Sequence, residues 1–420
     1  MNKKAKSLIK VSLATAVAGL MVSTAHANTE QQQIDQLRQE VATLKALVQQ
    51  QQQVQQVQQT QLATVEQQTA AAVKKAEDLK FSTAGGSEIR LYGSIRGDAN
   101  YIIEGADNDF NVVAASKEEA TDKLRSTLKT TRIGIDFNKA LDNGDKLGGK
   151  VETDFASSSE GLRIRHAYLT YNDWLFGQTT STFLSNHAPE MIDFGTNVGG
   201  GTARIPMVRY GHKVTPSTQV FVALEEGDNS ATGSTVKYSA PVLTAKVVQG
   251  FDEGKGSLSG RALVEHYKAD VGGDDAVGYG AALGVNYQVT SPLKLSADYS
   301  YVKGNNKYLY GSNTAFALDT ANQEIEQNEF HALQVGATYK FSPQLRSTLA
   351  YGTLLADDGT DYAALNAAGN EKVQQAWLNV IYSPVKPVDL GVEYVNGKRE
   401  TFAGDSYNDN RVGLMARYTF

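Results

Sequence analysis

Arginines at alternate positions of strand-like segments are the residues whose type and spacing point to chemistry in this chain. In the second, fourth and sixth segments these are Arg132, Arg163, Arg165 and Arg209. Side chains two residues apart along a strand point to the same face, so the guanidinium groups are expected on one wall. Fixed positive charges beside a narrow passage attract anions and exclude cations. The pattern predicts non-covalent handling of small anions.

The same alternation assigns more charges to the water-filled side of a barrel. Taken strand by strand, it predicts inward-facing Arg90, Arg96, Arg132, Arg163, Arg165, Arg209, Arg346, Arg411 and Arg417, with the acids Asp98, Asp136, Glu152 and Asp154. An alternative interpretation is that these charges only keep the wall wet.

A long polar segment at about 180–203 is the predicted constriction. It contains Glu190, Asp193 and the run Gly199–Gly201, and glycines allow the sharp bends that an inward-folded loop needs. Acids on this loop opposite arginines on the wall would set up a transverse field. Arg204 stands where the loop rejoins the next strand. We expect Glu190 and Asp193 to line the narrowest part of the pore.

The elements that position these residues follow a two-residue period from about Ser87 to the C-terminus. In the last segment, 411–420, one set of alternate positions is apolar, and the other carries Arg411 and Arg417. A strand between hydrocarbon and water needs this alternation, because a charge on the lipid face costs about 2–4 kcal/mol near the midplane. The strands of a soluble β-sandwich also alternate between apolar and polar residues. The turns must therefore distinguish a membrane barrel from a sandwich.

Seven short turns punctuate the strands and predict their number. Five contain proline, which lacks an N–H and suits turns rather than paired strands. The seven are predicted at 142–145, 172–173, 215–216, 240–241, 291–292, 342–343 and 383–384. Seven turns on one side imply sixteen antiparallel strands, with longer loops on the other side. Residues 260–270 also look like a strand, but in this scheme they belong to the fifth long loop.

The N-terminal region predicts export and self-association. Lysines, an apolar run of 12 residues from Val11 to Val22 and the sequence Ala25–Ala27 predict a signal peptide over 1–27. Residues 28–80 predict a Gln-rich periplasmic coiled coil, because apolar residues recur at spacings of three and four. Its core positions include Ile34, Leu37, Val41, Leu44 and Val48. The alternative for the Gln run 49–59 is a disordered linker.

Composition excludes several classes of function. The chain of 420 residues has no cysteine, so it has no disulfide, no Cys-ligated zinc and no thiol nucleophile. The net charge of −6 argues against nucleic-acid binding, which favours basic domains. No motif links a histidine to a serine or an acid, so we predict no catalytic residues, no metal and no cofactor. An enzyme embedded in the barrel and a structural tether remain as alternatives.

The C-terminal residues Tyr418 and Phe420 resemble the terminal aromatic signature of outer-membrane proteins. That resemblance implies that the barrel-insertion machinery recognises Phe420. The interpretation up to this point is an all-β transmembrane barrel of sixteen antiparallel strands over 81–420, integral to the Gram-negative outer membrane and surrounded by its lipids. The coiled coil would lie in the periplasm.

Short motifs around the third loop resemble the DcaP-like porins. They are Trp174–Thr179, Pro189–Glu190 with Asp193–Phe194, Arg204–Pro206 and Val208–Tyr210. The resemblance implies a homotrimer that takes up small anionic solutes such as dicarboxylates. It also implies that Arg165, Arg204 and Arg209 bind the carboxylates. The rival interpretation is a general diffusion porin with weak selectivity.

Overall fold

The structure of the protein is a computed structural model that describes residues 80–83, 85–157, 161–227, 236–238, 240–269, 273–305 and 307–420. The predicted signal peptide and the predicted coiled coil up to residue 79, with its core positions, lie outside the described residues. No helix in the described part of the chain is both long and apolar enough to span a membrane.

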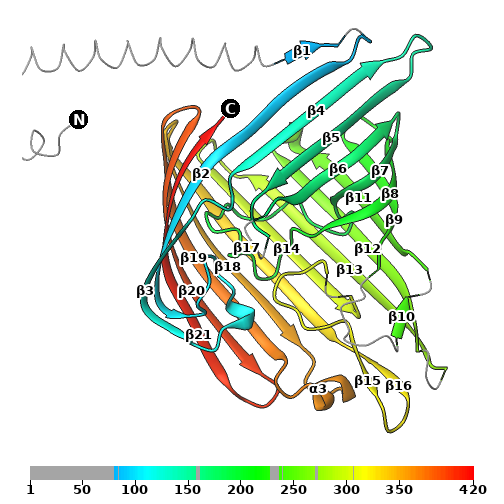
Figure 1. The fold of residues 1–420 in the computed structure, drawn as a ribbon, viewed down its shortest axis with the longest axis vertical. Helices are drawn as coiled ribbons and strands as arrows, with labels where there is room; N and C mark the ends of the chain where they lie inside the picture. The colour runs from blue at the N-terminus through cyan, green and yellow to red at the C-terminus, as the bar shows by residue number, and fades with distance from the viewer. Residues whose placement is uncertain are drawn as a thin grey trace, which may run out of the picture. The chain divides into compact units, whose positions relative to one another are not determined.

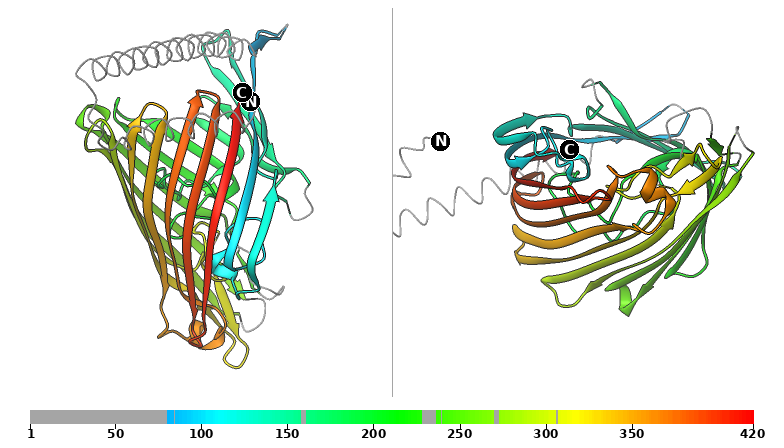
Figure 2. Two further views of the ribbon diagram at one scale, coloured as in Figure 1. Left: turned by 90° about the vertical axis from the view of Figure 1, so that its left-hand side faces the viewer. Right: turned by 90° about the horizontal axis from the view of Figure 1, so that it is seen from below.

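The described chain forms one closed antiparallel β-barrel (Figures 1 and 2). The sheet has 19 strand segments, of which β1 (Lys80–Ser82) only forms a short hairpin with β2. The ring closes because β2 pairs with the last strand, β21, on one side and with β3 and β4 on the other. The barrel segments are β2 (Glu88–Gly105), β3 (Ala120–Thr127), β4 (Arg132–Ala140), β5 (Lys146–Asp154), β6 (Arg163–Tyr171), β7 (Trp174–Thr180), β8 (Arg204–Lys213), β9 (Thr218–Glu225), β10 (Val236–Tyr238), β11 (Val242–Phe251), β12 (Gly256–Ala269), β13 (Asp275–Gln288), β14 (Leu293–Lys303), β17 (Glu329–Ser342), β18 (Leu345–Ala356), β19 (Asn370–Val385), β20 (Val388–Thr401) and β21 (Ser406–Thr419).

Two crossings of the wall are each broken into two segments. β3 and β4 pair with successive halves of β2, and β10 and β11 pair with successive parts of β12. With β1 set aside and each broken pair counted once, sixteen strands cross in the described part of the chain, which confirms the predicted number.

The identity of one turn and of one strand was predicted wrongly. Residues 240–241 are not a turn but the break between β10 and β11, where Pro241 lacks the N–H needed for the ladder. The turn at this place is the 3-10 helix η2 (Asp252–Gly254), and residues 260–269 cross the wall as part of β12. The outward positions of β12 include Gly260 and Ala262, so its apolar alternation is weak. The two errors offset one another, and the strand count is unchanged.

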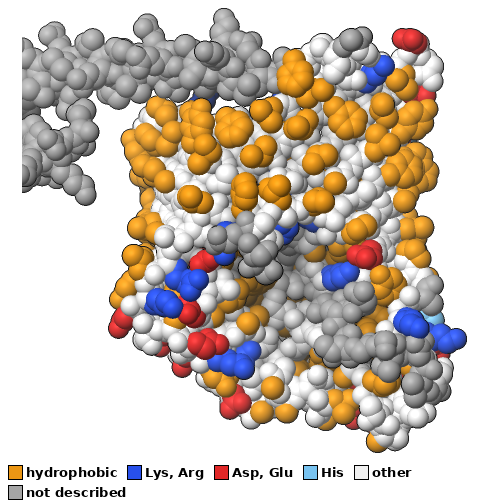
Figure 3. Space-filling model, viewed as in Figure 1, with side chains coloured by type: hydrophobic (Ala, Val, Ile, Leu, Met, Phe, Trp, Pro, Cys, Tyr) orange, Lys and Arg blue, Asp and Glu red, His pale blue; other side chains and the backbone are white. Residues whose placement is uncertain are grey.

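The outer face of the barrel is apolar. On β18, Leu349 is 61% exposed, while its neighbours Thr348 and Ala350 point inward and are buried. Figure 3 shows apolar side chains spread over the upper part of one face, with charged side chains gathering toward the end that carries the long loops. An exposed apolar band of this kind suits hydrocarbon rather than water.

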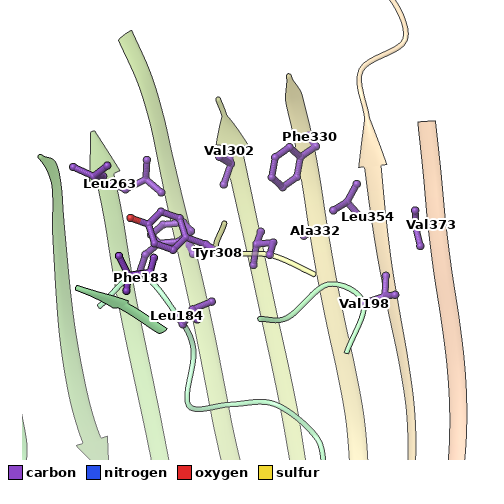
Figure 4. Packing of buried hydrophobic residues seen from close by; sticks show 14 of the residues in the cluster. Phe183, Leu184, Val198, Leu263, Val302, Tyr308, Phe330, Ala332, Leu354 and Val373 are labelled. Atoms are coloured by element: carbon purple, nitrogen blue, oxygen red, sulfur yellow. The ribbon is translucent and has the colours of Figure 1, made fainter. Parts of the chain in front are cut away.

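The core of the molecule lies inside the barrel, where loop 3 (181–203) packs on the wall. Phe183, Leu184 and Val198 of this loop are buried against wall residues that include Leu263 of β12 and Phe330 of β17 (Figure 4). Tyr308, from the loop between β14 and β17, joins this cluster. The long loops also carry the 3-10 helix η1 (Val113–Ala115), the hairpin of β15 (Phe316–Asp319) with β16 (Glu324–Gln327), and the helix α3 (Asp361–Leu365).

Glycines allow this close approach of loop and wall. A Cβ on Gly352 of β18 would lie 1.9 Å from the carbonyl oxygen of Val198. Gly199 has a φ of +81°, in the left-handed region that favours glycine. The glycine run noted in the sequence is therefore where the loop bends back along the wall.

Candidate functional site

Loop 3 leaves the wall after β7 and is fastened to the opposite side of the lumen. The guanidinium of Arg346 on β18 donates to the Glu190 carboxylate, at 2.8 Å from Nε to Oε2 and 2.8 Å from Nη2 to Oε1. The carbonyl oxygen of Glu190 accepts from Trp377 Nε1 at 3.1 Å and from Asn379 Nδ2 at 2.9 Å. Glu190 therefore anchors the loop to β18 and β19.

Asp193 is buried, and its hydrogen bonds help to hold the same loop. Its carboxylate accepts hydrogen bonds from the backbone N–H groups of Asn111 and Gly195, both at 2.8 Å. Glu393 of β20 accepts from the N–H groups of Ile192 at 2.8 Å and of Asp193 at 3.1 Å. The structure thus places both predicted constriction acids in contacts that hold loop 3, rather than opposite the arginines of β4 to β8.

Four arginines gather on the low-numbered strands, and we call Arg132, Arg163, Arg165 and Arg204 the arginine cluster. Arg132 lies on β4, Arg163 and Arg165 on β6, and Arg204 at the start of β8. β5 runs between β4 and β6, and its Asp154 pairs in register with Arg132 on one side and with Arg163 on the other. The register of three neighbouring strands therefore brings these side chains together.

Two carboxylates of β5 occupy part of the cluster. Asp154 accepts from Arg163 Nη2 at 2.7 Å and from Arg165 Nη1 at 2.9 Å. Glu152 accepts from Arg165 Nε at 2.7 Å and from the hydroxyl of Tyr92 at 2.8 Å. Arg163 and Arg165 are thus already engaged by the wall.

Arg132 and Arg204 are the less engaged members of the cluster. Arg132 Nε lies 3.3 Å from Glu152 Oε1, but this contact lacks hydrogen-bond geometry, and the buried Nε atoms of both arginines have no hydrogen-bond partner among the described residues. In that same part of the chain, Arg204 forms no ion pair, and the charges of Arg132, Arg163 and Arg165 act on it. Both residues are only partly buried, so the cluster presents two guanidinium groups that an anion can engage.

Aromatic side chains from two loops border the cluster. Phe194 of loop 3 lies under the Arg163 guanidinium, with 6.0 Å between Cζ and the ring centroid. Phe110 of loop 1, which joins β2 to β3 over 106–119, packs on Phe194 with 4.2 Å between ring centroids. The inward-folded loops therefore reach the edge of the cluster.

The structure places the other predicted arginines in separate contacts. Arg209 lies over the ring of Phe221 at 5.4 Å, apart from the cluster. The remaining five are paired with carboxylates: Arg90 with Asp136, Arg96 with Asp98, Arg346 with Glu190, Arg411 with Asp409 and Arg417 with Asp389.

The sequence analysis missed several inward cations, among them Arg261, Lys246 and the buried Arg399 of β20. Arg261 on β12 donates to Asp298 at 2.7 Å behind loop 3, and Lys246 on β11 donates to the carbonyl oxygen of Leu184 at 2.9 Å. Arg261 occupies an inward-facing position of β12. The alternation rule therefore predicts it as a lumen residue once residues 260–269 are assigned to a strand.

A metal site or a catalytic triad would require particular arrangements of histidine, serine and acidic side chains. Over the described ranges, no three His, Asp or Glu side chains are arranged to hold a metal ion. His187 of loop 3 and Ser259 of β12 form a hydrogen bond of 2.9 Å, but both side chains are buried between the loop and the wall, and Nδ1 of His187 has no partner in the described part of the chain. The pair therefore lacks the acid that a Ser-His-acid triad requires.

A closed sixteen-strand barrel with an apolar exterior, a charged lumen and an inward-folded third loop defines an integral outer-membrane channel of the porin class. The chain belongs to the DcaP outer membrane protein family, whose model matches residues 20–420. This membership confirms the predicted resemblance. It also confirms a channel rather than an enzyme, because the family consists of non-enzymatic porins.

Solved structures agree with this assignment. The outer membrane channel DcaP of Acinetobacter baumannii is 63% identical, covers 81% of this chain and 99% of its own, and has a TM-score of 0.78. The anion-selective porin of Comamonas acidovorans is 14% identical, covers 80% and 100%, and has a TM-score of 0.55. The trimer form of OmpT from Vibrio cholerae is 15% identical, covers 80% and 99%, and has a TM-score of 0.51. The last two show the fold alone. Among curated proteins, none matches the chain.

Proposed function

We propose that the channel is selective for small anions, dicarboxylates among them, and that they bind at the arginine cluster. The observation that carries this proposal is the excess charge of the cluster. Four arginines face two carboxylates, Glu152 and Asp154, and Arg132 and Arg204 keep Nε atoms without hydrogen-bond partners among the described residues.

Electrostatics supplies the mechanism. The cluster raises the concentration of anions beside loop 3 and lowers that of cations. A planar guanidinium donates two parallel hydrogen bonds to a carboxylate, so Arg132 and Arg204 could each engage one end of a dicarboxylate. Water in the lumen keeps these contacts weak enough for release, as passive diffusion requires.

Single-channel recording tests the proposal. Purified protein in planar bilayers under a salt gradient should give a reversal potential that favours anions, and a dicarboxylate should reduce the chloride current. Arg204→Ala should lower the anion preference about two- to threefold, since one uncompensated charge is lost. Arg417→Ala is the matched control, because Arg417 is paired with Asp389.

Other outcomes point to the rival functions. A wild-type channel with weak selectivity, unaffected by Arg204→Ala, would indicate a general diffusion porin. A closed pore would indicate a structural tether.

We also propose that the protein is a homotrimer in which neighbouring copies cover a low part of the wall. The strands β4 to β9 have 7 to 10 residues, whereas the wall strands β12 to β14 and β17 to β21 have 11 to 16. At about 3.3 Å per residue and a tilt near 45°, the short strands rise only about 16–23 Å, less than the apolar band of about 25 Å. A partner barrel would cover the remainder.

Single cysteines can test this arrangement, because the chain has none of its own. Val151 on the short strand β5 and Leu349 on the tall wall are both exposed outward. A short cross-linker with three thiol-reactive arms should join Val151→Cys copies into a covalent trimer, and it should not join Leu349→Cys copies. Equal cross-linking at both positions would contradict the proposed interface.

The N-terminal predictions remain proposals. We propose that residues 1–27 are removed on export and that residues 28–79 form a periplasmic coiled coil between the subunits. The mass of the mature protein should correspond to a chain that begins at Asn28. A variant without residues 29–79 should form channels whose trimers dissociate at a lower temperature.

A further inference from the structure

Two buried carboxylates stand inside the arginine cluster, where simple attraction of anions would not require them. The side chain of Glu152 is 6% exposed and that of Asp154 is 2% exposed. Each accepts hydrogen bonds from one or two arginines of the cluster. Their presence lowers the charge that an approaching anion meets.

The hydrogen bonds show how the charge is divided. Asp154 accepts hydrogen bonds from Nε and Nη2 of Arg163, at 2.9 and 2.7 Å. Arg165 donates one hydrogen bond from Nε to Glu152 and another from Nη1 to Asp154. Arg132 and Arg204 keep unpartnered Nε atoms in the described part of the chain. Four positive and two negative charges leave a net charge of two, carried by the guanidinium groups that are least engaged.

We infer that Glu152 and Asp154 are specificity-determining residues, which match the cluster to anions of two negative charges and keep their release fast. The inference rests on the proposed anion-binding function of the same site. A channel conducts only when binding is weak enough for the solute to leave. With both carboxylates neutral the cluster would carry four charges, and highly charged anions would bind best and leave slowly.

Coulomb's law gives the expected size of the effect. A unit charge at roughly 8 Å in water changes the binding of each ligand charge about twofold. Neutralising one carboxylate should therefore strengthen binding of a dianion about fivefold and of a trianion about tenfold, with smaller effects at high salt. The preference for the trianion should rise about twofold.

Amide variants separate the effect of charge from that of position. Glu152→Gln retains an oxygen that can accept from Arg165, and its new amide group can donate to the Tyr92 hydroxyl, so both contacts can be kept while the charge is lost. Asp154→Asn keeps one oxygen, which can accept from Nη2 of Arg163 and Nη1 of Arg165, but it loses the bond to Arg163 Nε. If the carboxylates act only by holding the arginines in place, the amides should leave selectivity unchanged or weaken anion binding. If they act by their charge, both amides should strengthen it.

The experiment uses the full chain in planar bilayers at low salt. Butanedioate and propane-1,2,3-tricarboxylate are titrated, and the dwell time of each block is measured. We expect longer blocks in Glu152→Gln and Asp154→Asn, more so for the tricarboxylate. The matched control is Asp389→Asn, which removes a lumen carboxylate paired with Arg417, and it should change neither dwell time. Heat-modifiable mobility in gels identifies folded barrels before recording.

The outcomes are distinct. Unchanged or shorter blocks in both folded amide variants would overturn the inference while leaving the proposed function standing. Equal lengthening by Asp389→Asn would also overturn it, because general lumen charge would then explain the effect. A wild-type channel without anion preference, blocked by neither acid, would overturn the proposed function itself.

Discussion

Glu190 and Arg346 join loop 3 to the far wall of the barrel through two hydrogen bonds of 2.8 Å. The loop begins after β7, and Arg346 lies on β18, so the pair ties together segments separated by 156 residues. Both side chains are about one quarter exposed to solvent in the lumen. This contact is one of several that hold loop 3, together with those of Glu393 and of the Glu190 carbonyl oxygen.

Breaking this pair should loosen loop 3. Arg346→Ala removes a charge-assisted contact worth about 1.5–3 kcal/mol when well formed, an upper range for a partly exposed pair. We expect larger current fluctuations in single-channel records and a changed mean conductance. Lys398→Ala is the control, because its pair with Glu400 lies outside the lumen. Records indistinguishable from wild type would mean that the apolar cluster alone holds the loop.

A methyl group at Gly352 should displace the same loop. The added Cβ would lie 1.9 Å from the carbonyl oxygen of Val198, so loop or wall must shift. Overpacking of this kind costs about 1–3 kcal/mol. The temperature of heat-induced unfolding should fall, and conductance should change. Gly260→Ala should be nearly neutral, since its nearest neighbour would be 3.7 Å away, and equal effects at both positions would contradict this reasoning.

Loop 1 should become less protected at acidic pH. Hydrogen bonds from Lys123 and Arg125 hold the pKa of Asp107 below its ordinary value. Burial alone would raise the pKa of Asp109, but hydrogen bonds from Lys129 and Arg125 outweigh burial, and the net pKa is lowered. A lowered carboxylate pKa stabilises the folded loop above the ordinary aspartate value, about 3.9, and this contribution is lost as the pH falls below it.

Hydrogen exchange of peptides from loop 1 can measure this effect. Protection, corrected for the intrinsic dependence of exchange on pH, should fall between about pH 5 and pH 3. The variant Asp107→Asn with Asp109→Asn should show weaker protection at neutral pH and little further change. A wild-type loop equally protected at both ends of this range would refute the prediction.

The C-terminal residue closes the seam of the barrel. The backbone N–H and carbonyl of Phe420 form hydrogen bonds of 3.0 Å with Gly93 on β2, and its ring lies beside Tyr418. Deleting Phe420 should slow assembly, because the seam loses two hydrogen bonds and the insertion machinery loses the terminal signal predicted from the sequence. Phe420→Ala keeps the backbone bonds and separates the two effects. Folding into detergent micelles without that machinery should be slowed by the deletion and little by Phe420→Ala.

The sequence by itself determined the features that depend on local pattern. A two-residue period predicted which side of each strand faces water, because lipid and water impose opposite preferences on neighbouring residues. It placed Arg132, Arg163 and Arg165 on the inner wall and predicted the correct number of strands. It also made residues 260–270 look like a strand, but the mistaken turn at 240–241 left them in a loop, whereas 260–269 belong to β12.

Tertiary structure alone decided which charges meet. Asp154 meets Arg163 through the register of β5 with β6, and Glu190 meets Arg346 through a loop that crosses the lumen. Parity says that a side chain points inward, but it does not say which distant residue it faces. That Arg132 and Arg204 are the less engaged arginines therefore emerges only from the folded barrel, because ion pairing depends on strand register and loop path, which are non-local.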